Sequence, residues 1–319
     1  MITYKLLLDD YKKNSNFKYC FYHDQAECSN KIKKAHSVQK NRILSQLESP
    51  VNGNNLIYSL NEFEDEDFKT KMLIPFGKNK ASIFTGFCDF HDSKLFSPVE
   101  NVPFKGTSEQ LFLLTYRAFA HGLHQLLETY NYYISKGEFI KYFPPNYLHE
   151  HIKLTRFRIE KSLKYKKILN SQIKQKDFNS ISYHYRIIKP FVPLACSSIL
   201  SPLYTFKNIS LNPREEYSYL VLNIIPDTTQ TFVCISQFAE DYKGKVFFEE
   251  FKTLTDTEFE IAISSLLIYC TTNTFFSPLL WDKFTYEEKQ QLYSEIDFCI
   301  KEGDKIDKFF LSQINFFKH

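Results

Sequence analysis

Residues 217–238 read YSYLVLNIIPDTTQTFVCISQF, two apolar runs with Asp227 and Thr228 between them. Each run is rich in β-branched and aromatic residues, which are typical of strands. A two-residue connection between such runs favours a β-hairpin. We therefore expect two adjacent antiparallel strands in this part of the chain.

Helical patterns follow the hairpin at about 255–270, 284–299 and 304–316. The first two begin with a Thr-x-x-Glu capping box, in which both side chains bind backbone N–H groups that the first helical turn leaves unpaired. Strands followed by helices predict an α+β arrangement. We place a small C-terminal α+β unit at 190–319.

The middle of the chain, 106–189, is predicted to be helical. Apolar residues recur at helical spacing over 107–133, and Thr107 or Ser108 can cap that helix. A second long helix is expected at about 146–177, where most of the basic charge lies.

Charge is unevenly distributed along a chain whose formal net charge is only +3. Residues 151–200 hold eleven basic side chains and two acidic ones, with aromatic residues among them. Cations and aromatics together suit phosphate contacts and base stacking. The same segment also fits an amphipathic helix whose charged face meets solvent or a protein partner. The candidate nucleic-acid-binding residues are Arg156, Arg158, Lys161, Lys164 and Lys167.

A strand-like run, ASIFTGF at 81–87, precedes the sequence Cys88-Asp89-Phe90-His91. A Cys-x-x-His turn aims both side chains at one point, and thiolate and imidazole are ligands that zinc prefers. A second pair of ligands is separated by seven residues, more than the usual two to four. We therefore expect a zinc-knuckle module over 1–105. The alternative is that these cysteines are buried and bind no metal. The predicted ligands are Cys20, Cys28, Cys88 and His91, and the predicted core thiols are Cys196, Cys234, Cys270 and Cys299.

Composition excludes several classes of protein. The 319 residues include only 8 Gly, and neither of the glycine motifs that bind phosphates occurs, so no dinucleotide or nucleotide-loop cofactor is expected. No apolar run is long enough to cross a membrane, and the N-terminal residues do not resemble a signal peptide. We expect a cytoplasmic protein, in which seven Cys do not indicate disulfides.

Several segments together resemble a family of bacterial proteins without an established activity. Its members share a C…C…AH[ST][VI]Q segment, which matches residues 20–39, and an FxGFCxxHDxxLFxx[IV]E segment, which matches residues 84–100. A C-terminal match at NTFFSP extends the resemblance to roughly residues 18–282. The resemblance implies that the N-terminal cysteines, His36, His91 and Asp92 belong to one set of motifs.

The same segment is distantly similar to the HNH, or treble-clef, nucleases. That resemblance implies zinc held by the four predicted ligands, with His36 as the general base for phosphodiester cleavage. It further implies Asp92 as a ligand for a catalytic Mg²⁺ and Asn41 as a residue that orients His36. The pattern departs from the family because the first pair of cysteines is not Cys-x-x-Cys. In the alternative, His36 replaces Cys20 as a zinc ligand and the site is closed and purely structural.

A third hypothesis concerns Arg117 and His124 on the helix at 107–133. They lie seven residues apart on one helical face and resemble the R-x(4–6)-H motif of HEPN-type ribonucleases, which act without metal. The sequence thus leaves three functions open. They are a metal-dependent HNH-like nuclease in defence against phage, a non-enzymatic binding or sensor protein with structural zinc, and a HEPN-like ribonuclease.

Overall fold

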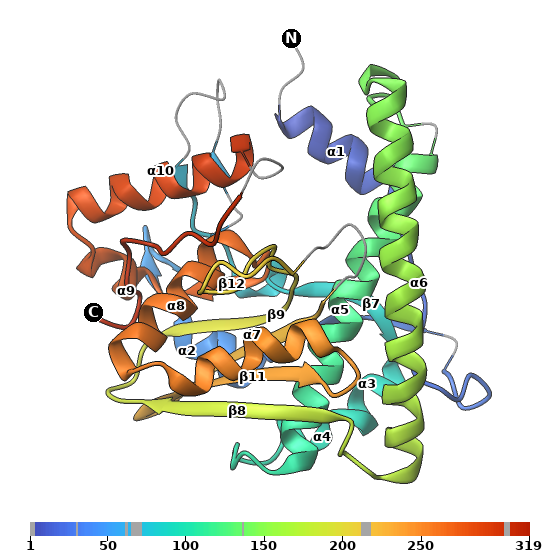
Figure 1. Cartoon of the computed structure of the whole chain (residues 1–319), viewed down its shortest axis with the longest axis horizontal. Coiled ribbons are helices and arrows are strands. Elements are labelled where there is room, and N and C mark those ends of the chain that lie inside the picture. The colour runs from blue at the N-terminus through green and yellow to red at the C-terminus, as the bar shows by residue number, and fades with distance from the viewer. Residues whose placement is uncertain are drawn as a thin grey trace.

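The protein is an α+β protein, as the sequence predicts. The computed structural model describes residues 4–29, 31–60, 63–64, 72–135, 137–211, 218–302 and 307–319. Within these residues it contains ten α-helices and a six-stranded antiparallel sheet, which Figure 1 shows with the long helix α6 (Pro145–Gln175) at one side.

The six strands come from all three parts of the predicted division. Their order across the sheet is β4 (Tyr58–Ser59), β12 (Thr274–Phe276), β9 (Leu194–Leu200), β10 (Leu220–Asp227), β11 (Gln230–Phe238) and β8 (Ile181–Ile188). The two edge strands therefore precede residue 190, so the sheet extends beyond the C-terminal unit that the sequence indicated.

The predicted hairpin is confirmed as β10 and β11. Asp227 pairs with Gln230, so the turn residues are Thr228 and Thr229, one position later than expected. Both strands are buried along most of their length. They read as nearly continuous apolar runs because helices cover both faces of the sheet.

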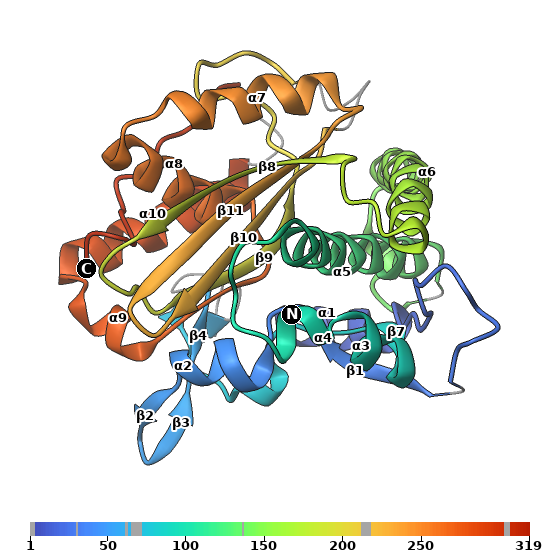
Figure 2. The same cartoon turned by 90° about the horizontal axis from the view of Figure 1, so that it is seen from below.

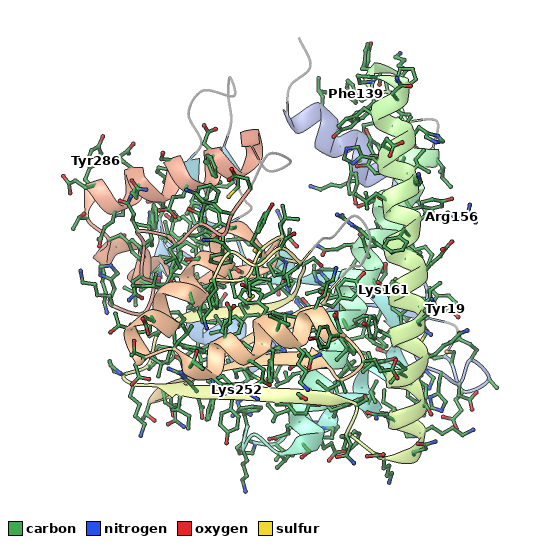
Figure 3. The ribbon with its side chains drawn as sticks, in the orientation of Figure 1. Tyr19, Phe139, Arg156, Lys161, Lys252 and Tyr286 are labelled. Carbon is green, nitrogen blue, oxygen red and sulfur yellow. The ribbon has the colours of Figure 1, made fainter. Side chains whose placement is uncertain are left out.

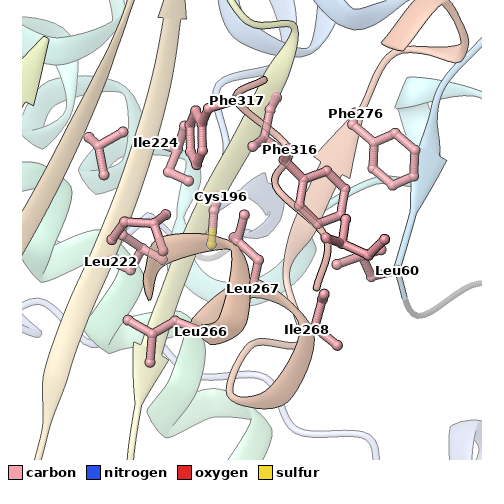
Figure 4. Packing of buried hydrophobic residues seen from close by; sticks show 14 of the residues in the cluster. Leu60, Cys196, Leu222, Ile224, Leu266, Leu267, Ile268, Phe276, Phe316 and Phe317 are labelled. Atoms are coloured by element: carbon pink, nitrogen blue, oxygen red, sulfur yellow. The ribbon is translucent and has the colours of Figure 1, made fainter. Parts of the chain in front are cut away.

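One face of the sheet packs against α7 (Tyr242–Thr253) and α8 (Asp256–Tyr269). Figure 4 shows this core, in which Leu222 and Ile224 of β10 belong to one cluster with Leu266 of α8. Burial of such apolar side chains is the main stabilising contribution in a protein of this size.

The C-terminal residues 307–319 close the same core without forming a helix, contrary to the helix predicted at 304–316. Phe316 is fully buried in the core (Figure 4), and its backbone N–H donates to Ser264 Oγ at 3.1 Å. Glu295 accepts hydrogen bonds from the Ser312 hydroxyl and the Gln313 N–H at 2.6 and 3.0 Å. These side-chain acceptors replace helical hydrogen bonds, so an extended segment can be buried.

The other face packs against α5 (Ser108–Ile134), which confirms the helix predicted at 107–133 with Thr107 as its cap. Figure 2 shows α5 between the sheet and α6. Helix α6 ends at Gln175, where Lys176 adopts a left-handed conformation with φ of 53°. The residues that follow turn into β8, so the basic segment ends in a strand.

The remaining elements surround these layers. No helix in the described part of the chain is long and apolar enough to span a membrane. The further helices are α1 (Tyr4–Asn14), α2 (Ser45–Leu47), α3 (Asp89–Leu95), α4 (Ser97–Glu100), α9 (Pro278–Lys283) and α10 (Tyr286–Glu302), with short helical turns at Lys40–Leu44, Lys78–Lys80 and Ile140–Tyr142. The further strands are β1 (Ile32–His36), β2 (Ser49–Val51), β3 (Asn54–Leu56), β5 (Phe63–Glu64), β6 (Met72–Leu73) and β7 (Ile83–Cys88).

Candidate metal centre

Strand β7 and helix α3 form the first half of the site. Strand β7 confirms the strand predicted at 81–87 and pairs antiparallel with β1, and α3 begins directly after Cys88. The His91 backbone N–H donates to Cys88 Sγ at 3.4 Å, so the Cys88 side chain caps the start of α3. This turn directs the Cys88 and His91 side chains to the same point.

The second half is the knuckle loop, residues 15–29, which has no helix or strand of its own. Its backbone runs along β7, where the Tyr19 and Phe21 N–H groups donate to Thr85 and Gly86 carbonyls at 3.1 and 2.9 Å. Gly86 suits this close approach, because a Cβ there would lie 3.0 Å from the Phe21 ring of the loop as well as 2.4 Å from the Phe84 ring of β7 itself. These contacts bring Cys20 beside the Cys88 turn.

Four side chains from these two halves converge. His91 Nδ1 lies 3.5 Å from Cys20 Sγ, 3.5 Å from Cys28 Sγ and 3.2 Å from Cys88 Sγ. All four ligand atoms lie within 4.8 Å of one another. Tetrahedral zinc, with bonds of about 2.3 Å to sulfur and about 2.0 Å to nitrogen, places these atoms about 3.6 Å apart. The arrangement therefore fits a four-coordinate metal ion.

The charged form of the cluster depends on a cation. Burial, followed by the neighbouring Cys20 and Cys88, raises the pKa of Cys28 to about 12. Burial acts in the same direction on Cys88, but hydrogen bonds from the His91 N–H and from Ser29 outweigh it and lower its pKa. Three thiolates cannot stay so close without a compensating charge, which a metal ion supplies.

The outer nitrogen of His91 faces a carboxylate. His91 Nε2 is buried and lies 3.9 Å from Glu27 Oε2, while the imidazole ring stacks on Tyr22 with centroids 4.0 Å apart. Burial lowers the pKa of His91, which favours the neutral form that binds metal. A carboxylate behind a histidine ligand orients the ring and increases its basicity.

His36 lies apart from the four ligands. It ends β1 opposite Ile83, and its Nδ1 is 2.8 Å from the Ala81 carbonyl oxygen, to which it donates. Of the described residues, His36 is not among those that could share a metal with the cluster. The geometry therefore selects Cys20 over His36 as the partner of Cys28, Cys88 and His91.

The other predicted catalytic residues do not assemble around His36. Asp92 is buried and forms an ion pair with Lys33 at 3.2 Å, and no second metal-binding group is found within the described residues. Asn41 is exposed at the turn after β1, and no hydrogen bond with His36 is seen in the part of the chain that the structure covers. These contacts give no support to a Mg²⁺ site at Asp92.

Arg117 and His124 are both buried, with 2% and 1% of their surface exposed. The Arg117 guanidinium donates to Glu100 at 2.6 Å and lies over the Phe96 ring at 3.9 Å. His124 Nε2 is 2.9 Å from the Phe17 carbonyl oxygen. Because both groups are committed to internal contacts, their surroundings count against cleavage of RNA by this pair.

Reasoning from spacing missed the residues that support the ligands. Glu27 and Tyr22, which contact His91, carry no motif and are recognisable only once the loop is placed. Among the other cysteines, Cys196 and Cys234 are buried as expected, whereas Cys270 and Cys299 are half-buried against the core.

Comparison of the chain with family models, curated proteins and solved structures finds no match.

Proposed function

We propose that the chain is a zinc-binding protein whose metal ion has a structural role. The observation that carries this proposal is the convergence of Cys20, Cys28, Cys88 and His91 at distances that fit tetrahedral zinc. Catalytic zinc sites keep one position for water, whereas four protein ligands fill the coordination sphere. A closed site of this kind stabilises a fold.

The role of such an ion follows from what the ligands connect. Cys20 and Cys28 lie on the knuckle loop, while Cys88 and His91 lie at the junction of β7 and α3. A bound ion would tie the loop to the antiparallel pair of β1 and β7, which packs on α5 through Phe84 and Phe87. The ion would add to the other contacts of the loop, which include the buried Phe21 side chain and the hydrogen bonds that Tyr116 and Asn170 donate to the Phe21 carbonyl.

Metal content tests this proposal. We expect one zinc ion per chain in purified protein, and loss of that ion in Cys28→Ser. The matched control is Cys299→Ser, which also changes a half-buried cysteine but lies outside the cluster. Metal-free wild-type protein, or equal zinc content in both variants, would refute the proposed ligand set.

A metal-dependent nuclease is the second candidate, and the position of His36 favours it. His36 ends β1 of a strand–strand–helix unit formed by β1, β7 and α3. Its Nδ1 is bound to the Ala81 carbonyl, so Nε2 carries the lone pair, and burial lowers the pKa of the ring. A neutral imidazole with a fixed tautomer is suited to act as a general base.

The nuclease candidate has its own test. His36→Ala should abolish divalent-metal-dependent cleavage of DNA or RNA while zinc content stays at one ion per chain. If wild-type protein shows no cleavage under these conditions, the nuclease candidate fails and the structural zinc remains. If His36→Ala loses zinc, His36 supports the fold and the assignment as a base is wrong.

A further inference from the structure

The exposed face of α6 carries a straight row of cations. At about 100° per residue, the row positions fall within an arc of about 80° on the helix surface. At a rise of 1.5 Å per residue, the row is about 32 Å long. Its members are all exposed and comprise Lys153, Arg156, Lys164, Lys167 and Lys174, which we call the basic row.

The structure separates the five cations predicted from sequence into two groups. Arg156, Lys164 and Lys167 belong to the basic row, whereas Arg158 and Lys161 are partly buried on another side of the helix. The Lys161 ammonium lies 6.0 Å from the Tyr165 ring centroid. Figure 3 shows Arg156 and Lys161 on different sides of α6.

Little negative charge accompanies the row. Glu160 is the acidic residue on the same arc, and it pairs with Arg156 at 3.1 Å. No ion pair of Lys153, Lys164, Lys167 or Lys174 occurs within the described residues. Five cations and one carboxylate leave a net charge of +4 along the row. Such a line of like charges favours an extended polyanion.

We propose that the basic row binds the phosphate backbone of a nucleic acid. Four of its five cations are lysines, which are common phosphate ligands but are depleted at protein–protein interfaces. Phe157, at the edge of the row, is an exposed aromatic side chain that is available to stack on a base. Phosphate contacts position a nucleic-acid strand and do not depend on its base sequence.

This proposal stands apart from the metal centre. The basic row lies on α6, and its residues contribute no ligand to the cluster. Binding would supply a substrate to the nuclease candidate, but it does not require cleavage. A protein with structural zinc alone would use the row equally well.

The test measures binding of fluorescent single-stranded DNA, single-stranded RNA and duplex DNA by anisotropy at several salt concentrations, without added divalent ions. The test variant is Lys164→Gln with Lys167→Gln. The control variant, Lys245→Gln with Lys252→Gln, removes the same charge away from the row, because both are exposed cations on α7. Thermal unfolding of each variant verifies that the fold is unchanged.

We expect wild-type affinity for at least one of the three probes to fall linearly with the logarithm of salt concentration. Loss of two phosphate contacts should weaken binding about tenfold and reduce the salt slope by about two. The control variant should stay within about twofold of wild type. An equal loss in both variants, or no binding of any probe, would overturn the proposal. If polyglutamate displaces the fluorescent probe as effectively as unlabelled DNA does, the row binds acidic protein segments instead and the proposal is wrong.

Discussion

The knuckle loop and the sheet core hold their conformations by different means. The loop, residues 15–29, has no regular secondary structure, and its ends are fixed by backbone bonds to β7 and by two of the four candidate ligands. The core between the sheet and α7–α8 consists of buried apolar side chains. Under the proposal of structural zinc, the first region depends on a bound cation in addition to its bonds to β7 and the buried Phe21, whereas the second depends on removal of apolar surface from water. The two should therefore respond to different perturbations.

Removal of one candidate zinc ligand should have the largest effect, and that effect should be confined to the knuckle loop. Cys88→Ser should eliminate zinc binding, because Cys88 is fully buried at the turn that directs His91. Structural zinc contributes about 10–16 kcal/mol of binding free energy in small metal-dependent domains. Hydrogen exchange should show rapid exchange at the Tyr19 and Phe21 N–H groups and continued protection in β10 and β11. Loss of protection in both regions together would show that they are one cooperative unit.

The converse perturbation removes packing from the core. Phe316→Ala should lower the free energy of unfolding by about 3–5 kcal/mol because a large buried side chain leaves a cavity. Zinc content should remain that of wild type. Phe157→Ala, on the exposed side of α6, is the matched control and should change stability by less than about 1 kcal/mol. Chemical denaturation measures both values, and zinc loss in Phe316→Ala would contradict the separation.

Acid should weaken the contact between α5 and β7, the strand along which the knuckle loop runs. His121 of α5 packs against the Phe84 ring of β7 at 5.2 Å, and burial followed by repulsion from His124 lowers its pKa to about 3. The unfolded chain takes up this proton near pH 6.5, so stability falls as pH decreases from 6.5 towards 3. The loss approaches about 1.4 kcal/mol per pH unit. Compared with wild type, His121→Leu should show a shallower decline in unfolding free energy, whereas identical slopes would exclude His121 as the cause.

The smallest change is expected in zinc affinity on substitution of Glu27, the carboxylate beside the candidate ligand His91. Glu27→Gln removes the charge that lies 3.9 Å from His91 Nε2, and zinc affinity should fall about tenfold. Competition with a chromophoric chelator measures this change. Glu287→Gln, an exposed acid on α10, should leave affinity unaltered. Equal affinity in Glu27→Gln would mean that the carboxylate does not act on the ligand.

Local patterns predicted the parts of the protein that depend on neighbours in sequence. Cys88 and His91 are three residues apart, and the Thr255–Glu258 capping box forms as its spacing indicates. The two-residue strand β4 carries too little pattern to be found, and it joins β12 more than 200 residues later. The helix predicted at 304–316 is wrong over the described residues 307–319, where Phe316 is buried through contacts with distant elements.

The candidate metal centre and α6 show the same difference between features set by nearby residues and features set by distant ones. Spacing could propose Cys20 and His36 as rival ligands but could not choose between them, because the choice depends on how the knuckle loop runs along β7. It also could not separate Arg158 from Arg156 on α6, since the buried side of that helix is set by α5. Both questions are decided by packing between segments far apart in the chain.

X-ray absorption at the zinc edge of the purified protein tests the central claim most directly. We predict one zinc ion per chain, with three sulfur neighbours at about 2.3 Å and one nitrogen at about 2.0 Å. This set corresponds to Cys20, Cys28, Cys88 and His91. Absence of zinc, or a shell of two sulfurs with additional nitrogen or oxygen, would contradict the closed structural site.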